Sequence, residues 1–363
     1  MLTDRDKAGL HSRTIRAIDE LEYNLLVLLA RKIGKLESFA SYEYAPLVGE
    51  VSIEANVMTN NAKQRVLNAA QRDFADEFML NGQMEARLSN KAAGSVSAAL
   101  VRNSAKRFSA SAFTNARLML ESETAGCAQG AVRGYIMACE TAAVQVSRIG
   151  TKEAMRNAIA WLGQQGITSR TYTRSNGTVV SVPVDVGIRR AMVNAGQRGR
   201  MEQTLFIARE TGHDLVEVNT TANARESHAE WQGQVYSLSG TDPNHEQFQS
   251  ACNVGDPVDG IGGYNCGHEV AMFYPEYGKT FSDPLKGTGY TTDQVRELTN
   301  QQRALERGIR RDKRTVSLLE SQGMSGGEYN AAIRDKQAQL RALVSENSAV
   351  LYRQPEREKT YGI

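Results

Sequence analysis

The sequence predicts an α+β protein with a mainly helical N-terminal region, a small mixed α+β module and a C-terminal helical hairpin. Residues 60–148 are rich in Ala, Gln, Arg, Glu, Leu and Met, which favour helices, and they contain no proline. Residues 213–278 instead combine short β-favouring runs with glycine-rich loops. Residues 292–344 return to apolar side chains at three-, four- and seven-residue steps, as in helices that pack along a seam.

The chain of 363 residues is long enough for two or three structural units of roughly 150 residues each. We place these units at residues 1–150, 151–290 and 291–363. Hydrophobic residues make up 41% and charged residues 23%, which is typical of a folded protein and argues against wholesale disorder. The net charge of +2 supplies no overall field that would draw the chain to nucleic acid or to an anionic membrane.

The sequence carries no visible signal for membrane insertion or export. No run approaches the roughly 18 consecutive apolar residues of a membrane span. The N-terminus opens on Asp4 and Asp6 rather than on the cationic and then apolar order of a secretory signal. Four cysteines do not form a disulfide framework in a chain of this length, so free thiols and synthesis in a reducing cytosol are expected.

The N-terminal region is expected to contain several helices. Residues 12–36 place apolar side chains at three- and four-residue steps and predict an amphipathic helix. Residues 39–54 contain a proline and a glycine and predict a connector. Helices then follow over residues 60–148, with breaks expected near Asn81–Gly82 and Ala93–Gly94.

The middle unit is expected to begin with a hairpin and a long helix. Asn176–Gly177 lies between β-favouring runs and predicts a tight type I′ turn. Asp185 is expected to cap a helix that ends near Gly212. Ser227–Glu230 has the S-x-x-E form of a capping box and predicts a short helical turn. Three later runs predict strands: Leu215–Val218, Val235–Leu238 and Val270–Tyr274.

The C-terminal unit predicts two helices in an antiparallel hairpin. The first helix is expected to begin at Thr292 or Asp293, and the apolar seam continues from there. Gly323 and Gly326–Gly327 interrupt the pattern, which then resumes. Because the interruption is short, the two helices should pack against each other.

Histidine and cysteine gather in the middle unit. Four of the five histidines and two of the four cysteines fall within residues 213–268. Cys266 and His268 are two residues apart, on the same side of an extended strand, and His228 can supply a third zinc ligand. Cys252 is the foremost candidate for a fourth ligand, with His245 or an acid as alternatives. Since the paired C-x-x-C spacing is missing, hydrogen-bonded core histidines beside a buried thiol remain an open alternative.

Other chemistry has less support in the sequence. A thiolate–imidazole dyad of Cys266 with His268 or His228 is disfavoured, because alternate residues of a strand rarely meet and no oxyanion hole is evident. Gly260–Gly263 is not followed by Lys-Ser/Thr or by a helix start, so it does not predict a phosphate loop. The sequence therefore predicts no catalytic residue and no binding residue for an organic cofactor.

A basic stretch runs from residue 296 to residue 314, with seven basic residues against three acids. Such a stretch can contact DNA phosphates, or it can be a solvated helix face beside a partner helix. The five candidate DNA contacts are Arg303, Arg307, Arg310, Arg311 and Arg314. Interleaved aromatic residues, which single-strand binders use, are missing here.

Several motifs, in the same order along the chain, resemble the phage minor capsid protein 2 family. The matching runs are Gly212–Val218, Ala224–Gly240, Gly263–His268, Asn300–Arg310 and Arg357–Gly362, with Gly166–Thr168 and Asp185–Ala191 upstream. The resemblance covers roughly residues 110–363 of the chain. This sequence departs from the family where Gly267 replaces the usual Arg of an Asn-Cys-Arg-His element and where Glu226 replaces a common Pro. Its first hundred or so residues also look shortened and divergent.

The resemblance implies a structural, non-enzymatic protein of a tailed-phage head, related to the Mu F-like head-morphogenesis proteins. It implies a place in the virion, synthesis in the host bacterial cytoplasm and several copies per particle. The implied partners are the portal and major capsid proteins, with double-stranded DNA as a further one and no membrane. Members of the wider group carry Cys/His clusters in this module, which favours zinc as the one cofactor. The alternative function is a virion-carried metal- or thiol-dependent hydrolase or effector.

Overall fold

A computed structural model describes residues 10–92, 94, 96–264 and 266–360. Within them the predicted fold class is confirmed: long helices dominate, a small module carries short antiparallel strands, and a helical hairpin follows. The expectations placed on Ala93, Asn265 and Tyr361–Gly362 lie outside the described residues. In the part of the chain described here, no helix is both long and apolar enough to cross a membrane.

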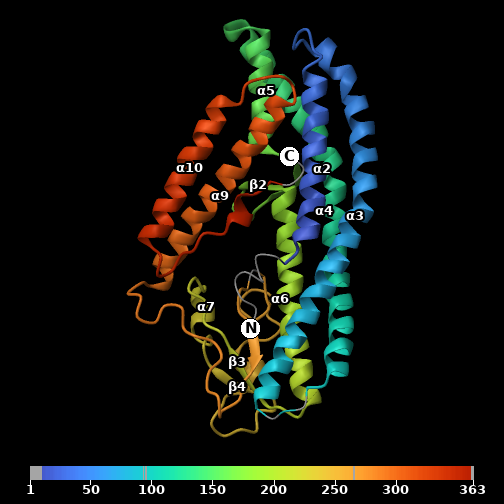
Figure 1. Ribbon diagram of the computed structural model, residues 1–363. Coiled ribbons are helices and arrows are strands. Elements are labelled where there is room, and N and C mark those ends of the chain that lie inside the picture. The colour runs from blue at the N-terminus through green and yellow to red at the C-terminus, as the bar shows by residue number, and fades with distance from the viewer. Residues whose placement is uncertain (1–9, 93, 95, 265, 361–363) are drawn as a thin grey trace.

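The body of the protein is a bundle of long helices that run along the molecule (Figure 1). Its helices are α2 (Ser12–Ile33), α3 (Ser41–Lys91), α4 (Ala98–Ile149), α5 (Thr151–Gln165) and α6 (Val184–Glu210). One apolar core joins all five, with Leu25, Phe74, Leu120, Ile159 and Ile188 each fully buried. Helices α5 and α6, which the sequence placed in a second unit, therefore share the core of α2 to α4.

Two predicted interruptions of the helices are wrong. Residues 39–54 form the start of α3 rather than a connector. Pro46 lies in the second turn, where the lost N–H removes a single hydrogen bond, and buried Val51 anchors the helix to the core. The helix also continues through Gly82, because this glycine lets α4 and α6 approach: a Cβ there would lie 3.1 Å from the Val101 Cγ1 and 3.0 Å from the Gln203 Nε2. The second expected break does separate α3 from α4.

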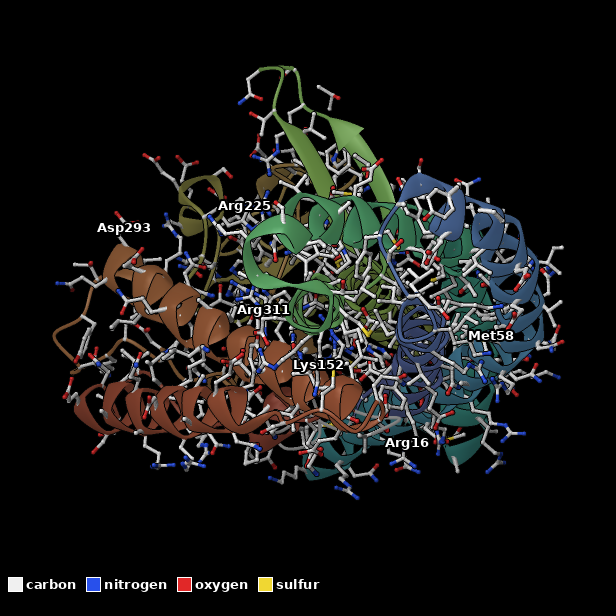
Figure 2. All side chains as sticks on the ribbon, turned by 90° about the horizontal axis from the view of Figure 1, so that it is seen from above. Arg16, Met58, Lys152, Arg225, Asp293 and Arg311 are labelled. Atoms are coloured by element: carbon white, nitrogen blue, oxygen red, sulfur yellow. The ribbon has the colours of Figure 1, made fainter. Side chains whose placement is uncertain are left out.

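The predicted hairpin is confirmed, although its turn differs from the expected type. Strands β1 (Thr168–Thr173) and β2 (Val179–Pro183) pair antiparallel, and the hairpin projects from the helices in Figure 2. The Gly177 N–H donates to the Arg174 carbonyl at 2.9 Å, and Gly177 is the residue of this turn with positive φ, at 81°. The Asn176 Oδ1 accepts from the Thr178 N–H at 3.1 Å, which favours a three-residue turn over type I′.

Glycines on α4 allow β1 to lie directly on the helix. At Gly126 and Gly130, a Cβ would be driven into the carbonyl oxygens of Ser169 and Thr168. One turn further along α4, a Cβ at Gly134 would be 3.5 Å from Leu162 and 3.7 Å from Leu29, which is ordinary contact.

We therefore expect opposite results from two alanine substitutions one turn apart. Gly130→Ala should lower the free energy of unfolding by about 1–3 kcal/mol, because the hairpin must shift. Gly134→Ala should leave stability unchanged or raise it by up to about 1 kcal/mol, because alanine favours a helix more than glycine does. Urea unfolding of both variants measures the contrast, and equal effects would exclude the close approach of β1.

Helix α6 begins two residues earlier than expected, which corrects the predicted role of Asp185. Its N-cap is Pro183, because the Val184 N–H already donates to the Ile167 carbonyl at 3.0 Å. Asp185 lies in the first turn, and its Oδ2 is 3.7 Å from the Arg310 Nη2. The end of the helix near Gly212, where φ is 67°, is as predicted.

The small module packs beside the lower part of α6 (Figure 1). In its sheet, β3 (Leu215–Val218) lies between β4 (Val235–Ser237) and β5 (Val270–Met272), with both pairings antiparallel. Two one-turn helices, α7 (Glu226–Ala229) and α8 (Phe248–Ala251), complete the module. The predicted capping box is wrong, because α7 begins at Glu226 and places Ser227 inside the helix. A second apolar core includes Val216, Trp231, Tyr236, Phe248, Cys252 and Cys266.

The C-terminal hairpin is formed by α9 (Thr292–Glu320) and α10 (Gly327–Glu346), followed by the 3-10 turn η1 (Pro355–Glu358). Helix α9 begins at Thr292, as predicted, and Thr291 and Gln294 form a capping box at its start. Near its other end, Leu318 and Leu319 enter the core of the helical body and anchor the hairpin there.

A buried carboxyl group connects the helical body to the module. The Glu85 Oε1 accepts from the Thr204 hydroxyl at 2.9 Å, and its Oε2 accepts from the Met272 N–H in β5 at 3.3 Å. Burial raises the pKa of Glu85 to about 7, from an ordinary value of 4.5. The folded state therefore holds this proton more tightly than the unfolded chain does.

The sign of the pH dependence follows from that raised pKa. Stability from Glu85 is fully present below pH 4.5 and is lost as the pH rises through about 7, because the unfolded chain releases the proton first. We expect Glu85→Gln to be more stable than the wild type at alkaline pH by about 1–3 kcal/mol, with the difference shrinking toward acidic pH. Thermal unfolding at both pH values tests this, and a pH-independent difference would contradict it.

Candidate metal centre

Three predicted metal ligands meet in the core of the module. His228 comes from α7, whereas Cys266 and His268 come from the loop that leads into β5. One ligand atom from each residue lies within 4.8 Å of the other two. The three residues are buried, at 2%, 3% and 4% exposure respectively. His228 thus meets Cys266 and His268, which lie 38 or more positions further along the chain, because β3, β4 and β5 fold around a common core.

The hydrogen bonds of His268 fix which of its nitrogens faces the thiol. Its Nε2 lies 3.0 Å from the Gln232 Oε1, and the same oxygen accepts from the Thr221 N–H at 3.0 Å. Since this oxygen can only accept, the His268 Nε2 carries the proton and donates it. The His268 Nδ1 is then unprotonated and accepts a hydrogen bond from the Cys266 thiol, with 3.6 Å between the nitrogen and the sulfur. Gln232 therefore orients a ligand in the way that outer-shell residues of metal sites do.

His228 presents an unpaired nitrogen in the same place. Its ring forms a hydrogen bond with the backbone of Val258, which leaves the Nε2. Among the described residues, this Nε2 is buried and has no hydrogen-bond partner. A buried imidazole nitrogen without a partner carries a desolvation cost of about 1–3 kcal/mol, which a bound metal ion would offset.

Both imidazoles are held in the neutral form that binds metal. Burial, followed by repulsion from His228 and Arg225, lowers the pKa of His268 to about 3. Burial and Arg225 also lower the pKa of His228. The Arg225 guanidinium donates to the carbonyls of Val258 at 2.7 Å and Tyr264 at 2.6 Å, and so joins the two sides of the glycine-rich loop. These contacts of Arg225 could not be predicted from the sequence, because every residue has a backbone carbonyl and no motif shows which ones an arginine will reach.

Trp231 covers the cluster. Its ring centroid is 4.6 Å from that of His228 and 4.6 Å from that of His268, and the residue is 3% exposed. Its backbone carbonyl accepts from the Tyr236 hydroxyl at 2.6 Å. Within the described chain, the Trp231 Nε1 is a buried donor without a partner. The indole thus shields the candidate ligands from water.

The candidates for a fourth ligand lie elsewhere. Cys252 is buried in the same core but is not one of the described residues whose ligand atoms meet, and burial raises the pKa of its thiol to about 12. His245 is paired with Asp242 at 3.0 Å. The Asp256 carboxylate accepts from the N–H groups of Val258 and Asp259. Among the described residues, the three that meet are therefore the candidate ligands that the structure brings together.

The donor set of one thiolate and two imidazoles suits zinc. Cys266 and His268 also meet as a thiol–imidazole pair, although the sequence predicted that two alternate residues of an extended strand would not. They meet because both precede β5, in a loop. A neutral His268 with a pKa of about 3 does not supply the imidazolium that activates a thiol.

Of the five arginines that the sequence proposed as DNA contacts, two are paired with the helical body and three are exposed. The Arg314 Nη1 lies 3.0 Å from the Glu22 Oε2, and Arg310 pairs with Asp185, so both point into the body. Arg303, Arg307 and Arg311 are exposed on α9.

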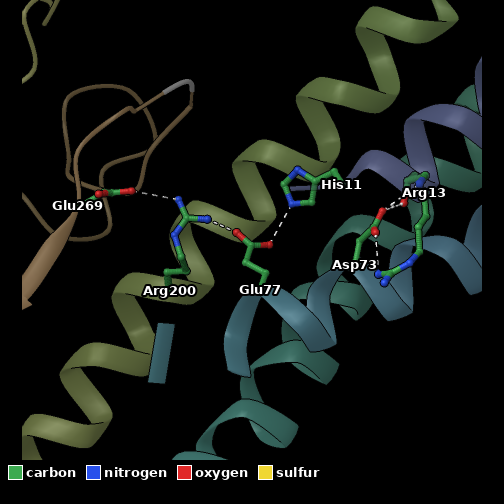
Figure 3. A network of polar contacts seen from close by, with 7 residues as sticks. His11, Arg13, Asp73, Glu77, Arg200 and Glu269 are labelled. Carbon is green, nitrogen blue, oxygen red and sulfur yellow. Dashed lines mark hydrogen bonds and ion pairs between the residues drawn. The ribbon is translucent and has the colours of Figure 1, made fainter. Parts of the chain in front are cut away.

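A buried charge network extends from Glu77 in α3 through Arg200 in α6 to Glu269 in the loop before β5, as Figure 3 shows. Glu77 of α3 is bonded to the His11 Nε2 at 2.9 Å and to the Arg200 guanidinium of α6. The Arg200 Nη2 lies 3.6 Å from the Oε1 of Glu269, the residue that follows His268. Sequence reasoning missed this network, because its members are far apart along the chain and share no motif.

Comparison with known protein families gives a single assignment. The family model for phage minor capsid protein 2 matches residues 47–345, most of the chain. Neither the curated proteins nor the solved structures contain a match to this sequence. The matched range includes the three candidate metal ligands, the contacts of Glu77, Arg200 and Glu269, and most of the helical hairpin, whereas His11 precedes it. The chain therefore belongs to the phage minor capsid protein 2 family.

Proposed function

We propose that the protein is a structural component of a tailed-phage head, located in the virion beside the portal or on the inner capsid. The family assignment supports the head role. Exposed apolar side chains on α3 and α4 support contacts with partner proteins, which we take to be the portal and major capsid proteins. The most exposed of them are Tyr42, Ile53, Leu118 and Val144. Synthesis in the host cytoplasm and several copies per particle belong to the same proposal.

Within that role, a zinc ion bound by His228, Cys266 and His268 holds the module together. The observation that carries this part is the buried His228 Nε2, which has no hydrogen-bond partner among the described residues, in a residue that offers a ligand atom within 4.8 Å of those of Cys266 and His268. Binding of zinc would draw these atoms together and release the thiol proton. The ion would replace the larger apolar core that so small a module lacks.

Two measurements test the proposal. Metal analysis of the purified protein should find about one zinc per chain, and a protein that stays metal-free in excess zinc would refute the staple. Crosslinking and mass spectrometry of purified virions should place the protein next to the portal or the major capsid protein. Its absence from virions that carry its gene would refute the head role.

A hydrolase remains the second candidate, because three protein ligands leave a fourth position, as in catalytic zinc sites. Burial of all three residues favours the structural role. Cobalt substitution discriminates between them. If added azide changes the visible spectrum of the cobalt protein, the site has an open position and the hydrolase gains support, whereas an unchanged spectrum supports the staple.

A further inference from the structure

Arginines from α9 and from η1 gather around a single buried carboxylate on α9. Glu306 is 2% exposed, and the Arg357 Nη1 lies 3.9 Å from its Oε2. Arg303 and Arg310 also act on this carboxylate, so three positive charges surround one negative charge. Partial burial, followed by repulsion from Arg357 and from Arg307, lowers the pKa of Arg303. The guanidinium groups are therefore close enough to repel one another.

Helix α6 contributes a further arginine. Arg189 lies close enough to Arg310 to lower its pKa, in addition to the effect of burial. In the described structure, the Arg189 Nε is buried and has no hydrogen-bond partner. Arg310 itself is engaged, because it donates to the Arg357 carbonyl and pairs with Asp185. Arg310 thus joins α9 to η1 and to α6.

The exposed part of this cluster forms a line along α9. Arg303, Arg307 and Arg311 are spaced four residues apart, within an arc of about 80° and along about 12 Å of helix axis. Within the described residues, the inter-element ion pairs made by arginines of α9 belong to Arg310 and Arg314, not to these three. A row of exposed positive charges matches the repeating charge of a nucleic-acid backbone.

We propose that Arg303, Arg307 and Arg311, with Arg189 and Arg357 beside them, bind the phosphate backbone of packaged double-stranded DNA. A protein interface usually has an apolar centre, and none of the described exposed large apolar residues lies on α9. Phosphate contacts need only guanidinium donors and carry no sequence preference, as a protein inside a filled head requires. This proposal rests on the head role proposed above.

Fluorescence anisotropy with a short DNA duplex tests the cluster over a salt series from about 50 to about 200 mM. The wild type should bind with a steep salt dependence. Arg303→Gln/Arg307→Gln should reduce the log–log slope by about 2, near 0.9 per phosphate contact. The matched control is Arg65→Gln/Arg72→Gln, which removes the same charge from exposed positions on α3 and should keep the wild-type slope.

Each outcome bears on the proposal. An equal reduction of the salt slope in both double variants would mean that DNA is attracted to the whole surface, and it would overturn the proposed binding site. Displacement of DNA by inorganic phosphate at equal ionic strength would point to a small-anion site, and equally tight binding of polyglutamate would point to an acidic protein partner. Either result would also overturn it. The zinc content of both variants should equal that of the wild type, and the virion location is tested separately. Failure of the DNA proposal can therefore be distinguished from failure of the proposed function.

Discussion

Cys266→Ser is expected to abolish the proposed zinc binding and to lower the free energy of unfolding of the module by about 3–5 kcal/mol. The serine hydroxyl does not replace a thiolate ligand, and two neutral histidines alone hold zinc weakly. His228→Ala should have the same effect, because it removes the nitrogen that has no other partner in the described structure. Metal content and thermal unfolding, with and without a chelator, measure both effects.

Two cysteine controls separate ligand loss from core damage. Cys139→Ala lies in the helical body, so it should lower stability through a small cavity and keep the zinc. Cys252→Ala lies in the module core and should also keep the zinc if it is not a ligand. Zinc loss in Cys252→Ala would instead identify the fourth ligand. The metal hypothesis fails if Cys266→Ser is less stable while the wild type contains no metal and does not respond to the chelator.

Much of the fold could be predicted from local patterns. Apolar periodicity and turn residues predicted α2, the three strands of the module, the β1–β2 hairpin and the C-terminal helix pair, all of which the structure confirms. The errors arose where tertiary contacts overrode local preference. Pro46 and Gly82 predicted breaks, but buried Val51 and the close approach of α4 and α6 keep α3 continuous.

The site could be predicted only in part, for a related reason. The short spacing of Cys266 and His268 was visible in the sequence, and the clustering of histidines pointed to His228. The roles of Arg225 and Gln232 depend on contacts with backbone groups and with one tautomer of His268, which no spacing encodes. Likewise, the periodicity of α9 did not show which of its arginines point inward, since that depends on Glu22 and Asp185 from other helices.

The charge network around Glu77 should be among the strongest polar contributions to stability. Glu77 is fully buried, and Arg200 is 7% exposed. Burial opposes ionisation of Glu77, but Arg200 and His11 outweigh it and hold its pKa below the ordinary value. The stability that this pair contributes is thus present at neutral pH and is lost as the pH falls through the lowered pKa. Removing either partner leaves the other charge buried.

Glu77→Ala is therefore expected to lower the free energy of unfolding by about 3–5 kcal/mol. Arg13→Ala is the matched control, because Arg13 pairs with Asp73 at 3.3 Å in the same region but is 51% exposed, so it should cost less than about 1 kcal/mol. The double variant Glu77→Leu/Arg200→Met should recover much of the loss, since neither charge is then left unpaired. Urea unfolding of the three variants decides the matter. A loss in Glu77→Ala no larger than in Arg13→Ala would mean that apolar contacts, and not this network, connect α3 to α6.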